Sequence, residues 1–71
     1  MTDAELNHLV KMANQIASNS ATGNAEEAAL AVASHIERFW AGAMRDKICG
    51  QLDQVSDELS PTALAALTRL K

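Results

Sequence analysis

Apolar residues between positions 29 and 43 recur at helical spacing, and this segment holds both aromatic residues of the 71-residue chain, Phe39 and Trp40. At about 100° per residue, the members of this stripe fall within roughly 120° of one another. They are Ala29, Val32, Ala33, Ile36, Phe39, Trp40 and Ala43. Phe39 and Trp40 lie about 100° apart, one on each flank of the Ile36 direction. A chain this short can seldom enclose two large rings on divergent flanks of one helix. We therefore expect one ring to face the core and the other to be free to face a partner.

Apolar residues elsewhere follow the same period and predict a single all-α domain over residues 1–71, a small bundle of three to four helices. We expect these helices at about 3–18, 25–41, 44–55 and 61–70. Three further sets of residues mark their apolar faces: Leu6, Leu9, Val10, Ala13, Ile16 and Ala17; then Met44, Ile48, Leu52 and Val55; and finally Leu64, Leu67 and Leu70. Leu30 is an exception, because it falls on the polar face of the second helix.

Capping signals support three of the expected helix starts. Each pairs an N-cap residue with a supporting residue in the first turn: Thr2 with Glu5, Asn24 with Glu27, and Ser60 with Pro61. Gly23 and Gly42 are expected near helix ends, because glycine costs about 1 kcal/mol relative to alanine inside a helix.

The expected core is thin, because many of the apolar residues that make up 48% of the chain are alanines. Alanine favours helix but buries little area. In a domain this small, burial at about 25 cal/mol per Å² comes close to balancing an ordering cost of roughly 1.5 kcal/mol per residue. An intrachain disulfide is excluded because Cys49 is the single cysteine. We therefore expect the isolated chain to be marginally stable or to self-associate.

The charge of the chain excludes one class of partner. With a net charge of −3 and six scattered basic residues, it lacks the basic face typical of nucleic-acid binding. No apolar run approaches the roughly 20 residues that span a bilayer, and the acidic start does not resemble a signal peptide. The lone thiol fits a reducing compartment. We expect a cytoplasmic protein with no nucleic-acid or membrane partner.

No group of residues has the spacing of a catalytic, cofactor-binding or metal site, so we expect none of these sites and no catalysis by this chain alone. His8, His35 and Cys49 lack ligand patterns such as His-x-x-x-His or Cys-x-x-Cys, and the glycines are isolated. We interpret His35, at the border of the apolar stripe, as a structural histidine, with proton handling as the alternative. Cys49 has no histidine near it in sequence, so we interpret it as a half-buried apolar residue rather than a nucleophile.

Two segments of the chain together form a family pattern. The segments are Leu9-Val10-Lys11-Met12-Ala13-Asn14-Gln15-Ile16-Ala17, and Val32-Ala33-Ser34-His35-Ile36-Glu37-Arg38-Phe39-Trp40 followed by Met44-Arg45. They resemble the delta subunit of soluble NAD-dependent molybdenum formate dehydrogenases. The Leu59-Ser60-Pro61 turn is also similar to that family, and the resemblance extends from Leu9 to Leu67. One departure is Gly42-Ala43, which stands where the family usually has Pro-Arg and leaves Arg45 as the only matching basic residue.

The resemblance implies a non-catalytic role in an oxidoreductase complex. A complex of this family oxidises formate with NAD⁺ and can run in reverse. Its large subunit carries the molybdenum cofactor and iron–sulfur clusters, and other subunits carry FMN and further clusters. The delta subunit is the small cofactor-free component, associated with assembly and stability of the molybdenum-containing subunit. The resemblance thus implies a hetero-oligomer in which this chain holds no cofactor of its own.

We expect the contact with the large subunit on seven residues. They are Phe39, Trp40, Met44 and Arg45, where the two rings diverge, with Lys11, Asn14 and Gln15 as a second patch. Buried interface centres favour aromatic, methionine and arginine side chains. Two other functions stay open as alternatives. One is a self-associating helical interaction module unrelated to formate oxidation, and the other is an enzyme or small-ligand carrier.

Overall fold

Five α-helices make up the part of the chain that the structure, a computed structural model, describes, which is residues 3–20 and 23–71. In chain order they are α1 (Ala4–Asn19), α2 (Ala25–Phe39), α3 (Gly42–Gly50), α4 (Leu52–Val55) and α5 (Pro61–Leu70). No strand occurs in these two stretches. The predicted all-α class is confirmed, but the number of helices is five rather than three to four.

The additional helix arises because the segment expected as one helix at 44–55 is divided at Gln51. This residue has φ −120° and ψ 23°, outside the helical range. Its backbone N–H donates to the Ile48 carbonyl at 3.2 Å, the third preceding residue rather than the fourth. Gly50, a weak helix former, directly precedes the break. A short helix of nine residues and a single turn, α3 and α4, therefore replace the one predicted helix.

Side-chain caps hold the starts of α2 and α5 as predicted. The Asn24 Oδ1 atom accepts hydrogen bonds from the backbone N–H groups of Glu26 at 2.8 Å and Glu27 at 3.3 Å. The Ser60 Oγ atom accepts from the backbone N–H of Ala63 at 3.2 Å. Each cap satisfies donors that have no partner within the helix, a contribution of about 1 kcal/mol.

The start of α1 differs from the prediction. The helix begins at Ala4, and Asp3 is its N-cap, with Oδ1 accepting from the backbone N–H of Leu6 at 3.1 Å. Thr2, the expected cap, lies outside the described residues. An aspartate carboxylate is as good a cap as a hydroxyl and also complements the positive end of the helix dipole.

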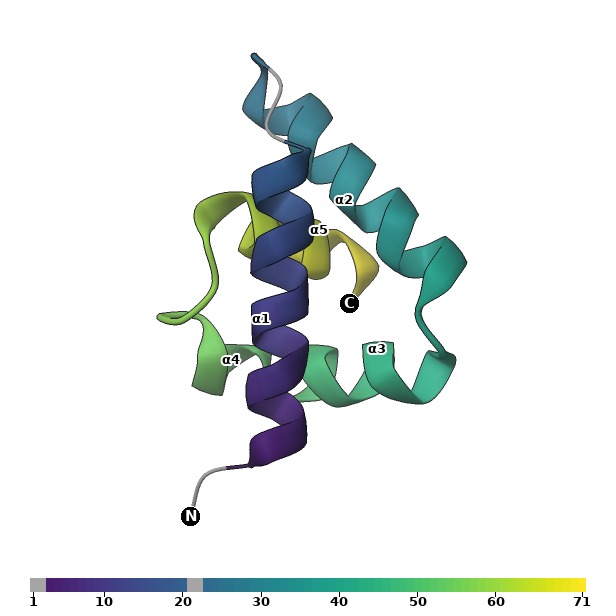
Figure 1. Ribbon diagram of the computed structural model, residues 1–71, viewed down its shortest axis with the longest axis vertical. Helices are drawn as coiled ribbons and strands as arrows, with labels where there is room; N and C mark the ends of the chain where they lie inside the picture. The colour runs from purple at the N-terminus through teal and green to yellow at the C-terminus, as the bar shows by residue number, and fades with distance from the viewer. Residues whose placement is uncertain (1–2, 21–22) are drawn as a thin grey trace.

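The five helices enclose one core, with α5 at its centre. Figure 1 shows α1 running along the molecule with α2 beside it, while α3 and α4 lie across the end where α1 begins. α5 packs against each of the other four helices, and α1 packs also against α2 and α3. Every helix contributes a buried side chain to the core, for example Leu9, Ile36, Ile48, Leu52 and Leu67.

Buried alanines are frequent in α2 and α5, the two helices that pack together most extensively. The buried alanines are Ala28, Ala29 and Ala33 of α2, and Ala63 and Ala66 of α5. Small side chains let two backbones approach closely, although each buries little area. The fold is nevertheless as compact as expected: its radius of gyration is 11.0 Å, and about 11 Å is typical of a folded domain of this length.

The predicted apolar faces are buried to different extents. In α1 and in the α3–α4 segment the predicted residues are buried, except that Ile16 and Met44 are only partly covered. In α5, only Leu67 of the three predicted leucines is fully buried, and Leu64 and Leu70 are partly covered. The two buried alanines of α5, Ala63 and Ala66, complete its inward face together with Leu67.

Candidate functional site

The two aromatic rings face different environments, as predicted. Trp40 belongs to the core cluster, with 7% of its surface exposed, whereas Phe39 is 70% exposed. The backbone explains this difference, because α2 ends at Phe39 and turns extended at Trp40, with φ −85° and ψ 141°. Trp40 was expected among the partner-contact residues, but its burial makes it a core residue of the free chain. Phe39 is the ring available to a partner.

Phe39 begins an uncharged stretch on the surface, which we call the α2–α3 corner: Phe39, Ala41, Gly42 and Ala43. All four residues are exposed. Figure 1 shows the connection between α2 and α3 at the outer edge of the molecule, well to the side of α1. An exposed ring surrounded by residues this small is accessible from several directions. The corner therefore presents one large apolar ring next to three small residues.

Met44 and Arg45, the other predicted contact residues here, lie only partly on the surface. Met44 packs against the core, and Arg45 is half-buried. The guanidinium of Arg45 is near enough to the Cys49 thiol to influence its pKa. These two side chains therefore border the α2–α3 corner, and Phe39 is its main apolar group.

His35 contacts Phe39 one helical turn away. The two ring centroids are 4.8 Å apart and the rings are tilted by 43°. This distance is within the range of favourable aromatic pairs, and residues four apart on a helix face the same way. His35 is itself exposed, so it supports the Phe39 ring from the surface side of α2 rather than from the core.

The second predicted patch, on α1, divides into surface residues and one structural residue. Lys11 and Gln15 are exposed. The Asn14 amide is instead bonded within the chain: its Nδ2 donates to the Glu58 carbonyl, and its Oδ1 accepts from the Ser60 backbone N–H, both at 2.8 Å. The role of Asn14 as a partner contact stays a prediction, and these two bonds give the residue a structural role as well. Asn14 joins α1 to the turn that precedes α5.

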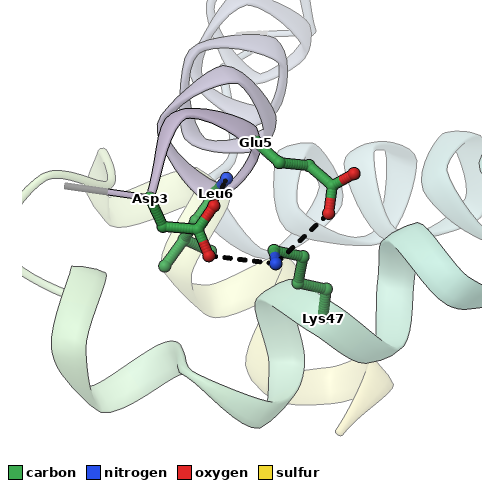
Figure 2. Close-up of polar contacts among 4 residues, drawn as sticks. All are labelled: Asp3, Glu5, Leu6 and Lys47. Atoms are coloured by element: carbon green, nitrogen blue, oxygen red, sulfur yellow. Dashed lines mark hydrogen bonds and ion pairs between the residues drawn. The ribbon is translucent and has the colours of Figure 1, made fainter. Parts of the chain in front are cut away.

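An ion-pair cluster joins α3 to the first turn of α1, and sequence reasoning missed it. Figure 2 shows the Lys47 ammonium between two carboxylates, with Nζ 2.9 Å from Asp3 Oδ2 and 3.2 Å from Glu5 Oε1. The hydrogen bond from Lys47 lowers the pKa of Asp3, and its reciprocal bond to Asp3 raises the pKa of Lys47. Acidic residues at a helix start are a common signal, but their basic partner lies more than forty residues away in sequence.

Cys49 is half-buried against α5, as its interpretation as an apolar residue predicts. Its Sγ lies 3.8 Å from the Leu67 carbonyl oxygen, to which it donates a weak hydrogen bond. Burial raises the pKa of the thiol. A thiol held in its protonated form is a poor nucleophile, so this environment does not favour chemistry at sulfur.

A metal site and a membrane span each require a particular arrangement of residues. Across positions 3–20 and 23–71, no three histidine, cysteine or acidic side chains come together as metal ligands would. None of the helices in these stretches combines the length and apolar character needed to cross a membrane. The α2–α3 corner is therefore the strongest candidate site that the described residues offer.

The chain matches a known protein family over most of its length. The family model described as NADH-dependent formate dehydrogenase delta subunit, FdsD, matches residues 8–67, which is all but the first seven and last four residues. The match includes the α2–α3 corner, His35, and both partners of the Asn14 amide. Searches of curated proteins and of solved structures gave no match.

Proposed function

The chain belongs to the family of NADH-dependent formate dehydrogenase delta subunits, and we propose that it is an accessory subunit that binds the large molybdenum-containing subunit and stabilises it or helps it to assemble. The observation that carries this proposal is the family match over nearly the whole chain. Because the match covers residues 8–67, few residues lie outside it that could carry a function separate from that of the family.

The exposed Phe39 ring supports a role in binding. Monomeric proteins expose single apolar residues routinely, but Phe39 is 70% exposed and is followed by Ala41, Gly42 and Ala43, so a partner can cover the ring without burying a charge from these three residues. We propose that the α2–α3 corner contacts the large subunit, bordered by Met44 and Arg45. Lys11 and Gln15, on α1, are proposed as a second contact.

We further propose that this subunit is not catalytic. The raised pKa of the Cys49 thiol and the surface position of His35 against Phe39 favour packing roles for both residues. In this proposal the molybdenum cofactor, the iron–sulfur clusters and FMN all belong to partner subunits. The cytoplasm is the proposed location, because a single free thiol fits a reducing compartment.

The proposal is tested by producing the large subunit with and without this chain. With the chain carrying an affinity tag, we expect the large subunit to co-purify. Without the chain, we expect a lower yield of molybdenum-loaded large subunit, but the same rate of formate oxidation per bound molybdenum. Absence of co-purification would refute the binding role. A fall in the rate per molybdenum would refute the non-catalytic role.

A further inference from the structure

The segment from residue 41 to residue 51, which contains α3, is held to the bundle by fewer buried side chains than the long helices are. Of its residues, all of which the structure describes, Ile48 is the one that is buried. By contrast, α1 and α2 each bury five residues and α5 buries three. The segment lies between two core residues, Trp40 before it and Leu52 after it. Its two ends are therefore anchored, while its middle depends on few contacts.

α3 also lacks the features that stabilise a helix by itself. It has nine residues, a length at which an isolated helix is marginal in water. Among residues 3–20 and 23–71, no side chain caps its start, whereas Asp3, Asn24 and Ser60 cap the starts of α1, α2 and α5. Glycine stands at both of its ends, and the backbone is outside the helical range at Ala41 and Gln51. α3 therefore depends on its contacts with other helices.

The main polar attachment of α3 is the ion-pair cluster at the start of α1. In Figure 2 the Lys47 ammonium lies between the carboxylates of Asp3 and Glu5. Asp3 uses its other carboxylate oxygen to cap α1, accepting from the backbone N–H of Leu6 at 3.1 Å, so this cap does not need Lys47. The Cys49 thiol adds a weak hydrogen bond to a carbonyl of α5, at 3.8 Å. The ion pairs of Lys47 can thus break while α1 keeps its cap.

From this arrangement we propose that α3 opens as a separate unit, in which residues 41–51 detach and unwind while α1, α2 and α5 keep their core, and that the ion pairs of Lys47 oppose this opening. Opening uncovers Ile48 and the partly covered Met44 and Cys49, far less apolar surface than unfolding of the whole bundle uncovers. Local openings of this kind have a lower free energy than global unfolding. Because the paired side chains are partly exposed, salt weakens the attachment. The opening is a property of the free chain and is independent of the proposed function.

The chain after Gln51 is held by different contacts and stays in place. Leu52 and Val55 of α4 are buried. Asn14 of α1 makes two hydrogen bonds to backbone groups of the turn before α5. These bonds are intact when α3 is open and are lost when the bundle unfolds. A substitution at Asn14 therefore favours global unfolding but not the opening of α3, whereas a substitution at Lys47 favours the opening.

Native-state amide hydrogen exchange of the full-length chain, followed by NMR, tests this proposal. In wild type, the amides of α3 should exchange faster than those of α1, α2 and α5, and low urea concentrations should change their exchange little, because the opening exposes little surface. Asn14→Ala should speed exchange in α1 and α5 by about thirtyfold, as the loss of two hydrogen bonds implies, and leave α3 unchanged. Lys47→Ala should speed exchange in α3 by about two- to fivefold. Lys11→Ala, at an exposed lysine of α1, is the matched control and should leave α3 unchanged.

Exchange of α3 in step with the other helices would overturn the proposal. In that case the α3 amides would share the rates and the steep urea dependence of the core amides, and would accelerate with them in Asn14→Ala. If Asn14→Ala does not fold, the urea dependence of wild-type exchange decides between the two results. At about 1 M salt, wild-type α3 should exchange nearly as fast as α3 of Lys47→Ala. An α3 rate that neither salt nor Lys47→Ala changes would refute the role of the ion pairs.

Discussion

Replacing Asn14 by alanine tests the most specific long-range contact in the bundle. The substitution removes both hydrogen bonds of the amide, to the Glu58 carbonyl and the Ser60 N–H, which are 44 and 46 residues away in sequence. At about 1 kcal/mol for each bond, the free energy of unfolding should fall by about 2 kcal/mol. In a domain of this size that loss corresponds to a decrease in Tm of about 8–16 °C.

Thermal unfolding followed by circular dichroism measures this loss. Gln15→Ala is the matched control, because Gln15 is the exposed neighbour on the same helix and should change stability by less than about 0.5 kcal/mol. Asn14→Asp keeps the acceptor for the Ser60 N–H but places a carboxylate against the Glu58 carbonyl oxygen. It should therefore lower the free energy of unfolding by at least half as much as Asn14→Ala does. An Asn14→Ala variant that melts within 2 °C of wild type would show that the amide does not hold the turn before α5.

Three further predictions concern the core, the thiol and the ion pairs. Trp40→Ala should destabilise the chain by about 3–5 kcal/mol and abolish its cooperative thermal unfolding, whereas Phe39→Ala should leave the unfolding curve almost unchanged. A larger loss of stability in Phe39→Ala than in Trp40→Ala would show that Phe39, and not Trp40, is the buried ring. Cys49→Ala should leave assembly and formate oxidation of the complex intact, and the wild-type thiol should react slowly with a thiol reagent at pH 8; fast reaction or lost activity would indicate a chemical role. Lys47→Ala should lower stability most between pH 3.8 and pH 10.5, the ordinary pKa values of Asp3 and Lys47. Because the pKa of Asp3 is lowered in the folded chain, the stability that the Asp3 carboxylate contributes is lost as pH falls below this range. Because the pKa of Lys47 is raised, the stability that the Lys47 ammonium contributes is lost as pH rises above it. Chemical denaturation across this pH range, at low and high salt, measures that difference, and a constant difference down to pH 2 would contradict it.

Local patterns were sufficient to predict α1, α2 and α5, because their signals depend on residues a few positions apart. The apolar stripe of α1, the Asn24 cap of α2 and the Ser60 cap of α5 all involve residues within one or two turns. The division at Gln51 was missed, since the apolar spacing continues through it and gives no sign of a break. Gly50 was the local signal available there, and α3 and α4 together still bury the predicted side chains.

The site was only partly predictable, because it depends on where chain segments meet. Spacing alone indicated that the two rings diverge, but not which of them turns inward. That choice follows from the end of α2 at Phe39, two residues earlier than expected. In the same way, Asn14 on a polar helix face looks solvated until the turn at 58–60 is placed beside it. Long-range pairs of this kind leave no periodic signal in one sequence.

The contacts of α5 with all four other helices determine when the core can be completed during synthesis. This helix is made after the other four, yet it packs against every one of them. While the ribosome is still producing residues 61–70, the inward sides of α1 to α4 have no complete surface to close against, and their apolar residues stay open to water and to chaperones. The bundle is therefore incomplete until α5 packs against its neighbours and Asn14 engages the turn before it. A large subunit that recognises the folded α2–α3 corner would then select completed chains over unfinished ones.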